Sequence, residues 1–414
     1  AAVTTAGEAT LIGRHAGINL TTGSSNTFIG GRAGQNTTTA IENTAVGQAA
    51  LLTNSTGANN TALGRAALLS NTTASGNTAV GRNAMVSSTT GANNVSVGHL
   101  SLAVNTTGAN NVAIGMQCLD ANTTASNNTG VGQNALTANT TGSENTAVGT
   151  DALKANTTAG NNTAVGYYSG QANTTGTQNV SLGAYSFYTN TKSNRNTALG
   201  YNTLASHNLT GDSNGYNTCV GFQAGSDITT GTQNTFIGGL VGDTTTTASN
   251  NVAVGYNSFT ANTTGTSNTA MGVDALDANT TGANNTSLGG NSLGANTTAA
   301  QNTAVGKDAL KTTTTGTGYN TALGWNAGGG ATTPAASTFL GARAGEAHRT
   351  GTGVICIGYQ ADMPGGDSDT CIVMGYQVTG VGTNNFTIGH GSSDSNIAFG
   401  ATSITAPSDI RLKE

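Results

Sequence analysis

Apolar residues recur along the chain at intervals of 17 residues, and each is followed at once by a glycine. The stretch NTAVGTDALKANTTAGN, which begins at Asn145, shows the unit, with Val148 directly before Gly149. A short unit repeated at a fixed period is typical of a solenoid, in which each repeat forms one coil. Positions below are counted from the coil glycine, so Val148 is at −1. The coil glycines at the regular interval are Gly13, Gly30, Gly47, Gly64, Gly81, Gly98, Gly115, Gly132, Gly149, Gly166, Gly183 and Gly200, then Gly221, Gly238, Gly255, Gly272, Gly289 and Gly306, then Gly324, Gly341, Gly358 and Gly375.

The three residues before each coil glycine predict a short β-strand. Position −1 is apolar throughout, position −2 is usually Ala, Ser or Cys, and position −3 is Thr or a β-branched apolar residue in nearly every coil. Strands favour these residue types, and the glycine bounds the run. Small or apolar side chains on both faces are typical of strands that lie inside a larger assembly. We therefore expect an all-β fold, a parallel β-solenoid or β-roll of 17-residue repeats.

At two positions of the repeat a change in side-chain size at one is matched by the opposite change at the other, and this predicts a contact between consecutive coils. Position +4 is usually Leu, Met or Phe but is Gly in some coils, and three of these glycines are followed by Phe at the next position −2. Because packed interiors tolerate changes that conserve volume, we expect position +4 of one coil to contact position −2 of the next. The compensated pairs are Gly17 with Phe28, Gly225 with Phe236 and Gly328 with Phe339, whereas Gly34, Gly170 and Gly345 precede Ala45, Ser181 and Cys356.

Asparagine forms two further columns, at position −4 in most coils and at position +7 in many. Stacked identical amides can hydrogen-bond along a ladder of parallel strands, and Asn tolerates turn conformations. We therefore expect Asn156, Thr157 and Thr158 to form the corner of a coil, with an amide ladder running through the stack.

Interruptions of the period define the expected organisation. The period holds to Gly200, is broken by a four-residue insertion within Ser206–Asn217, and slips by one residue near Gly324. Proline removes a ladder donor, and the chain has none before Pro334, which fits a continuous sheet. The expected division is a continuous shaft (residues 1–380), shortened terminal coils (381–407, with coil glycines Gly389 and Gly400) and a separate C-terminal segment (408–414).

Charge is scarce, and this excludes several classes of function. Charged residues make up 7% of the chain and the net charge is −5, so we expect no basic nucleic-acid surface. No apolar run approaches the roughly 20 residues that cross a bilayer, and no signal peptide is visible.

The chain lacks an initiator Met, so we expect a processed piece of a longer protein. A short coil with few charges leaves apolar area exposed on a lone chain, and we therefore expect an oligomer of side-by-side chains.

Side chains that could bind ions or sugars form no regular set in the sequence. The cysteines replace small residues or Asn, so we expect small buried side chains and no disulfide framework. The histidines have no partners at zinc spacing, and we expect them to be solvated or packed. Asp362, Asp367 and Asp369 could hold calcium, although a solvated turn is the expected structure. Aromatic residues after the glycine could stack on sugars, but covering the outer face is their more ordinary role. These residues are Cys118, Cys219, Cys356 and Cys371; His15, His99, His207, His348 and His390; and Tyr167, Tyr168, Tyr185, Phe187, Tyr188, Tyr201, Phe222, Tyr256, Trp325, Tyr359 and Tyr376.

The repeat motif resembles that of a known family. NTAVG at Asn145, NVAIG at Asn111 and NVSLG at Asn179 are similar to the head repeats of trimeric autotransporter adhesins. The resemblance implies three left-handed parallel β-rolls lying side by side as a homotrimer. The present unit is longer than is typical of that family.

The C-terminal residues carry a second resemblance. The sequence SDIRLKE, from Ser408 to Glu414, resembles the start of the self-cleaving intramolecular chaperone of phage tail fibres and tailspikes, the endosialidase type. The resemblance implies that the chaperone assembles the trimer and is then cut off at the Ser408–Asp409 bond. The family's catalytic Ser–Lys pair would fall on Ser408 and Lys413, and a lysine next to a hydroxyl nucleophile can serve as its base.

The sequence thus predicts a structural fibre of a phage tail, a homotrimer of the virion that attaches to a host-surface glycan or protein. No cofactor, metal, nucleic acid, membrane insertion or enzymatic activity other than self-cleavage is expected. We expect the irregular segments Ser206–Asn217 and Ala331–Ser337 to be the first places to test for host binding.

Three alternatives remain open at this point. A trimeric adhesin of the bacterial cell surface would have the same repeats. An ice-binding solenoid is suggested by the Thr columns at positions −3, +8 and +9, although the free mixing of Thr with Val at −3 suits packing better. A glycan-cleaving enzyme needs paired carboxylates across a groove, and the 18 Asp and Glu residues show no clustered pair outside the tail.

Overall fold

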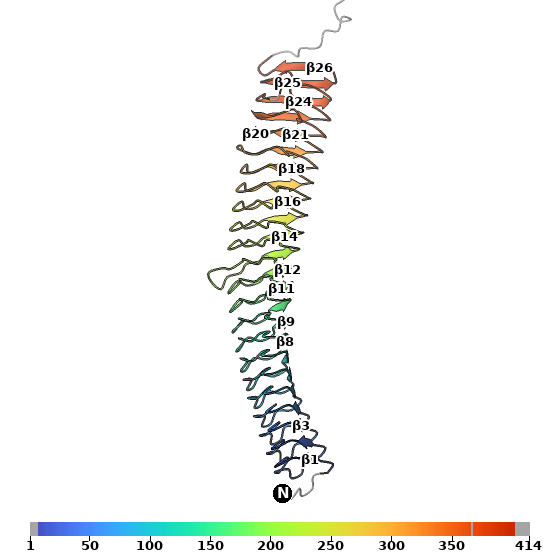
Figure 1. Ribbon diagram of the computed structural model, residues 1–414. Helices are drawn as coiled ribbons and strands as arrows, with labels where there is room; N and C mark the ends of the chain where they lie inside the picture. The colour runs from blue at the N-terminus through green and yellow to red at the C-terminus, as the bar shows by residue number, and fades with distance from the viewer. Residues whose placement is uncertain (1–6, 366, 402–414) are drawn as a thin grey trace, which may run out of the picture. The chain divides into compact units, whose positions relative to one another are not determined.

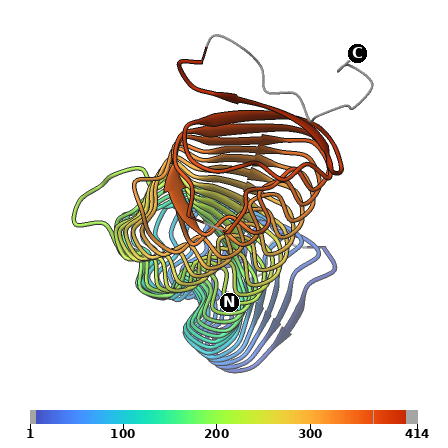
Figure 2. The same ribbon diagram turned by 90° about the horizontal axis from the view of Figure 1, so that it is seen from above.

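The computed structural model describes residues 7–365 and 367–401, and these contain strands and turns but no helix. Contacts divide the chain into two compact units, Ala1–Gly215 (unit 1) and Tyr216–Glu414 (unit 2), and each is described by itself. Within each unit the coils lie one above the next (Figure 1), and the view from above shows their strands overlying one another (Figure 2). The expected parallel β-solenoid of 17-residue coils is confirmed.

Each coil of unit 1 contributes one three-residue strand, at positions −3 to −1. Neighbouring strands pair in parallel and in register, so that Thr146, Ala147 and Val148 lie beside their equivalents one coil later. The strands of unit 1 are β1 (Thr10–Ile12), β2 (Thr27–Ile29), β3 (Thr44–Val46), β4 (Thr61–Leu63), β5 (Thr78–Val80), β6 (Val95–Val97), β7 (Val112–Ile114), β8 (Thr129–Val131), β9 (Thr146–Val148), β10 (Thr163–Val165), β11 (Val180–Leu182) and β12 (Thr197–Leu199).

Unit 2 repeats this arrangement and adds a short second sheet and a hairpin. Its parallel strands keep the one-coil register across the slip near Gly324, because Thr303 pairs with Thr321. The strands are β13 (Thr218–Val220), β14 (Thr235–Ile237), β15 (Val252–Val254), β16 (Thr269–Met271), β17 (Thr286–Leu288), β18 (Thr303–Val305), β19 (Thr321–Leu323), β20 (Thr333–Ala335), β21 (Thr338–Leu340), β22 (Thr350–Thr352), β23 (Val354–Ile357), β24 (Cys371–Tyr376), β25 (Asn385–His390) and β26 (Ser393–Ala398).

The coil glycine is required by close backbone approach as well as by conformation. Gly149 has φ of 132°, in a region that side-chain-bearing residues rarely adopt. A β-carbon at this position would lie 2.5 Å from the carbonyl oxygen of Gly166 in the next coil. Stacking therefore forces glycine at position 0, which accounts for the most regular feature of the sequence.

The turn after the glycine is tight and strained. Asp151 and Leu153, at positions +2 and +4, have left-handed φ angles of 58° and 48°. Leucine in this conformation is unfavourable by itself and persists only where surrounding contacts hold it. Leu153 is buried against the small residues Ala147 and Ala152, so its burial offsets the backbone strain.

The predicted contact between positions +4 and −2 is confirmed. A β-carbon at Gly17 would lie 3.1 Å from the ring of Phe28 in the next coil. The same ring also fills the space beside Gly34 of its own coil, where a β-carbon would lie 2.6 Å from it. Each Phe at position −2 therefore lies between two glycines, and Gly34 and Gly345, which lacked a partner in the sequence, are paired with Phe28 and Phe339 of their own coils.

Both predicted asparagine ladders are present and buried. At position −4 the backbone N–H of Asn145 donates to Oδ1 of Asn128 at 2.9 Å, and its Nδ2 donates to the carbonyl of Ala159 at 2.8 Å. At position +7, Nδ2 of Asn156 donates to Oδ1 of Asn139 at 2.9 Å. The ladders satisfy amides that would otherwise be costly to bury, and they tie each coil to its neighbour.

The C-terminal end corrects one expectation. Gly400 was expected to be the glycine of a shortened coil, but the strand before it, β26, runs antiparallel to β25, with Asn385 opposite Ala398. Only residues 391 and 392 separate these strands, whereas a parallel return needs a dozen residues or more. The segment Ala331–Ser337, expected to be an irregular bulge, contains β20, which pairs in parallel with β22.

Candidate functional site

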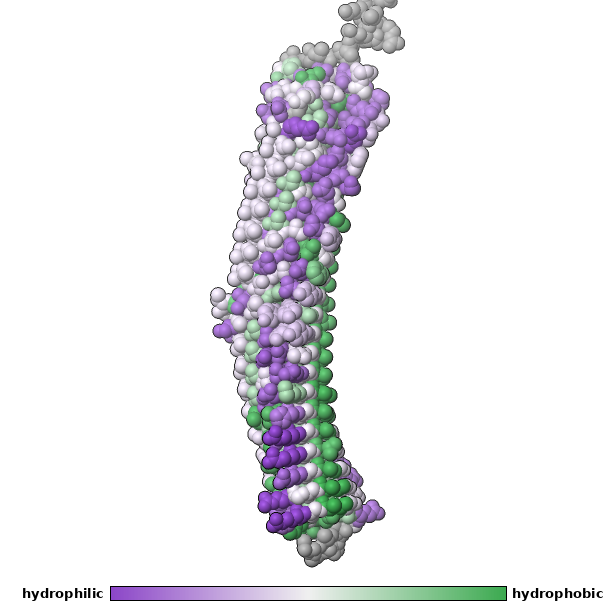
Figure 3. All heavy atoms as spheres, viewed as in Figure 1, coloured by the Kyte–Doolittle hydropathy of each residue, from purple (hydrophilic) through white to green (hydrophobic). Residues whose placement is uncertain are grey.

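The outer face of the strands carries a column of exposed apolar side chains. Position −2 points inward and is buried in every coil after the first, so positions −3 and −1 point outward by the alternation of a β-strand. Residues at −1, which we call the apolar column, run from Ile12 to Leu199 in unit 1 and from Val220 to Ile388 in unit 2. The exposed fraction is 57% at Ile12 and 44% at Ile388. Figure 3 shows the column in green along the coils of unit 1.

The sequence predicted that both faces of the strands would be buried in an assembly. In the single chain only the inward face is buried, and the residues of the outward face are exposed or half-buried. A stripe of Val, Ile, Leu and Met along a sheet is larger than the apolar patches that soluble monomers usually expose. That another chain covers it stays a prediction.

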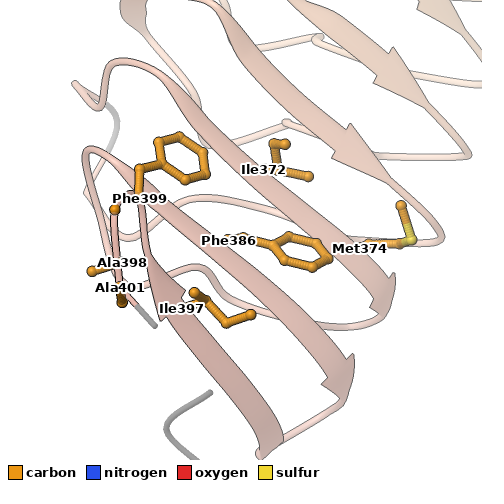
Figure 4. Close-up of a pocket in the computed structure, with 8 residues that line it drawn as sticks. Ile372, Met374, Phe386, Ile397, Ala398, Phe399 and Ala401 are labelled. Atoms are coloured by element: carbon orange, nitrogen blue, oxygen red, sulfur yellow. The ribbon is translucent and has the colours of Figure 1, made fainter. Parts of the chain in front are cut away.

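The apolar column ends in unit 2 at a hollow of about 330 Å³. Ile372 and Met374 of β24, Phe386 of β25 and Ile397 of β26 point into it, and Phe399 borders it (Figure 4). Position −3 is Ile372 or Phe386 here, where most coils have Thr, so two apolar columns meet. The lining contains no charged side chain, which suits it to receive apolar side chains rather than to perform catalysis. We call this site the terminal hollow.

The exposed and half-buried tyrosines pack on one another. In unit 1 the ring centroids of Tyr167 and Tyr185 lie 5.6 Å apart at 88°, and those of Tyr168 and Tyr185 lie 5.6 Å apart and stacked. In unit 2 Tyr359 and Tyr376 are stacked at 5.3 Å, and His390 extends the stack. Rings packed on one another, edge-on or stacked, cover part of each other's faces, so the geometry favours a cover for the outer face over a platform for sugars.

The acidic cluster does not converge on a cation site. Oδ2 of Asp362 accepts from the N–H of Ala347 at 2.7 Å, and Oδ1 of Asp369 accepts from the N–H of Thr352 at 2.7 Å. Asp367 accepts from the hydroxyl of Thr350. Among residues 7–365 and 367–401, no group of three or more His, Cys, Asp or Glu side chains could hold a metal ion.

The four cysteines are buried and unpaired with one another, as the sequence predicted. Burial raises the pKa of the Cys118 thiol to about 12 and that of the Cys371 thiol to about 11. Thiols held in the protonated form are poor nucleophiles. These side chains therefore fill space in the core and supply no reactive group.

Two histidines occupy buried positions in the stack that sequence reasoning did not identify. His207 and His348 stand at position +7, where many coils have the ladder Asn, and both are fully buried. The His207 ring stacks on Phe187, with Nε2 3.0 Å from the hydroxyl of Ser193. Burial lowers the pKa of His207 to about 4 and also lowers the pKa of His348. Counting positions from the coil glycine would have revealed both.

The threonine column at position +8 is engaged within the stack. The hydroxyl of Thr140, at position +8, donates to the carbonyl of Thr157 in the next coil at 3.0 Å, and Thr157 donates in turn to Thr174 at 3.1 Å. Hydroxyls bound to the backbone are not free to order water. This arrangement disfavours the ice-binding alternative for the +8 column.

The insertion of unit 1 forms an exposed loop that is attached to earlier coils. Oδ1 of Asn208 accepts from the hydroxyl of Thr191, and Oδ1 of Asp212 accepts from the hydroxyl of Thr175, each at 2.8 Å. The loop projects from the side of the stack (Figure 2). A loop presented on a repetitive scaffold is the usual location for recognition.

The predicted self-cleavage residues Ser408 and Lys413 lie outside the described residues, so their geometry is not tested. The part of the chain that the structure describes contains no helix long and apolar enough to cross a membrane.

The chain was compared with protein families, with curated proteins and with solved structures. The chain matches no profile of a protein family, no curated protein and no solved structure at a significant level. Its function must therefore be inferred from the geometry of its own surface.

Proposed function

We propose that this chain is the shaft of a structural fibre in which copies associate side by side along the apolar column. The observation that carries the proposal is the column of Val, Ile, Leu and Met side chains at position −1, which are exposed or half-buried along each unit. Burying apolar surface stabilises an assembly by roughly 25 cal/mol per Å². Contributions repeated at every coil add up to a strong association.

The most suitable occupant of the column is a second copy of the same chain. Its apolar side chains repeat at the spacing of parallel strands, about 4.8 Å, and an identical solenoid has the same spacing along its whole length. A compact globular partner could match only a few coils. With so few charged residues in the chain, copies lying in parallel meet little electrostatic repulsion. The resemblance to autotransporter heads favours three copies.

The resemblance of residues 408–414 to a phage chaperone favours a tail fibre of a virion over an adhesin of the bacterial surface. In that role the shaft holds binding loops away from the particle. The part of the insertion loop at residues 208–214 is largely exposed and is anchored by Asn208 and Asp212, so it is the first candidate for contact with a host glycan or protein.

Two lysine substitutions test the association. Val165 and Leu182 lie on consecutive strands, and each is more than a third exposed, so a lysine can extend into solvent in a lone chain. Val165→Lys with Leu182→Lys should shift the protein from assembled to single chains in size-exclusion chromatography with light scattering. The matched control is Thr141→Lys with Thr158→Lys, at exposed positions away from the column. Assembly that survives the first pair as well as the second would refute the proposal.

Replacement of residues 206–217 by a regular turn tests the attachment role. The variant should still assemble but should bind host cells less than the unaltered fibre does. Unchanged binding would remove this loop as the attachment site, and loss of assembly would show that the loop is structural.

A further inference from the structure

The cationic residues of the first coils gather on one narrow surface. All arginines and lysines among residues 7–119 stand at the first or second position after a coil glycine, and all are exposed. Two exposed histidines share these positions. We call this set the arginine column: Arg14, His15, Arg32, Arg65, Arg82 and His99.

The stacking of coils brings these charges close together. The N–H of Arg32 donates to the carbonyl of Arg14, and the N–H of Asn83 donates to the carbonyl of Arg65, so residues at these positions lie one strand apart. One strand spacing is about 4.8 Å. Arg14 and Arg32 also line an open hollow of about 350 Å³ together with Gly31 and Gln48. Figure 3 shows strongly hydrophilic side chains beside the green apolar column on the first coils.

These arginines have no anionic partner within the described part of the chain. Ion pairs there join Lys154 to Asp151, Lys307 to Asp308 and Arg343 to Glu346, and none involves the arginine column. The carboxylates of the same coils, Glu8 and Glu42, stand at position −5, in a separate column. Like charges stacked on neighbouring strands are unfavourable. An anion lying along the column would relieve the repulsion, which points to a ligand outside the chain.

We propose that the arginine column binds a linear acidic polysaccharide. A guanidinium forms paired hydrogen bonds with a carboxylate or with a sulfate or phosphate ester, and a polymer with repeated acidic groups can contact several coils at once. The column is open to solvent along the stack, which suits an extended chain. Nucleic acid is the weaker alternative, because Phe, Tyr and Trp, which would stack on bases, do not occur at positions +1 or +2 of the first six coils.

The proposal is independent of the fibre function and has its own test. The full chain is titrated with polygalacturonate, with neutral dextran and with a thirty-residue oligothymidylate, in 50 mM and 300 mM salt. Polygalacturonate should bind, dextran should not, and the affinity should fall at the higher salt concentration because the contacts are ionic. Tighter binding of the oligothymidylate than of polygalacturonate, or no binding of polygalacturonate, would overturn the proposal.

Charge-removing variants locate the site. Arg65→Gln with Arg82→Gln should weaken polygalacturonate binding by about tenfold, whereas Lys192→Gln with Lys311→Gln, which removes two charges elsewhere, should change it less than about twofold. Circular dichroism confirms that both variants are folded, and light scattering reports their assembly. Equal affinity of the two double variants would overturn the proposal, as would loss of assembly in the arginine variant, which would assign the column to contacts between chains.

Discussion

Phe28 and Gly34 share a single volume in the core, because a β-carbon at Gly34 would lie 2.6 Å from the Phe28 ring and its three nearest neighbours would all be atoms of that ring. Ordinary coils fill the same volume with Ala at position −2 and Leu at position +4, as at Ala147 and Leu153. The core therefore accepts either arrangement, provided that the total volume is conserved.

This relationship predicts the outcome of a double-mutant cycle. Phe28→Ala should lower the free energy of unfolding by about 3–5 kcal/mol through the cavity it leaves, and Gly34→Leu should destabilise by overpacking. The combined variant gives this coil the ordinary pair of Ala at position −2 and Leu at position +4, and it should be more stable than the sum of the single effects by about 2 kcal/mol or more. Denaturant unfolding measures all four proteins, and strict additivity would show that the two positions do not share space.

Neighbouring glycines provide a matched test of the stacking rule. Gly30 has φ of 133° and a β-carbon there would lie 2.6 Å from the carbonyl oxygen of Gly47, whereas a β-carbon at Gly31 would have no atom within 4 Å. Gly30→Ala should therefore lower the free energy of unfolding by more than about 2 kcal/mol, and Gly31→Ala should change it by less than about 0.5 kcal/mol. Equal changes in the free energy of unfolding for the two variants would contradict the close approach of the coils.

Much of the fold could be predicted from the sequence because every coil meets a copy of itself. Identical stacking requires the same residue at equivalent places, so the glycine, the small −2 residue and the ladder Asn all appear as columns. The exchange of Phe28 with Gly17 was predicted for the same reason. The pairing of Phe28 with Gly34 was missed because both residues belong to the same coil. The repeat period shows which residues of neighbouring coils lie beside each other, but not which residues of one coil are in contact.

Other features could not be predicted because they depend on chain direction or on surface chemistry. The motif before Gly400 looks like another coil, and only the two-residue turn before β26 makes the strand antiparallel. Arg65 and Arg82 occupy equivalent positions of consecutive coils in the sequence, but whether they form a charged surface depends on which positions face solvent. The net charge of the chain does not reveal this grouping, because it sums the charges on all faces.

Buried His207 predicts a loss of stability in acid. Its pKa is lowered from 6.5 to about 4 by burial, so the unfolded chain binds the proton more readily between these values. The free energy of unfolding therefore has the full contribution of neutral His207 above pH 6.5. It decreases as the pH falls toward 4, by up to about 3 kcal/mol. Unfolding free energies measured between pH 7 and pH 4 should show this slope.

The variant His207→Asn isolates this effect. Asn at position +7 restores the residue type of the ladder below it, where Asn190 donates to Asn173. The free energy of unfolding of this variant should depend less on pH than that of the unaltered protein, and the variant should remain folded at pH 7. His99→Asn, at an exposed position, serves as the control. A slope that His207→Asn leaves unchanged would assign the acid sensitivity to other groups.

The buried thiols should resist modification in the native protein. All four cysteines are buried, and burial raises the pKa of each, so little thiolate forms at pH 8. Titration with a disulfide reagent should detect almost no thiol in the native state and all four after denaturation. Rapid reaction of one or more cysteines in native protein would show that the coils around them open readily.

The lateral association of chains is the central claim, and the mass of the assembled protein tests it most directly. Sedimentation equilibrium of the unaltered chain at micromolar concentration should give three times the chain mass of 40.7 kDa. A mass of one chain throughout the concentration range would contradict the account, because the apolar column would then be stable in water without a partner.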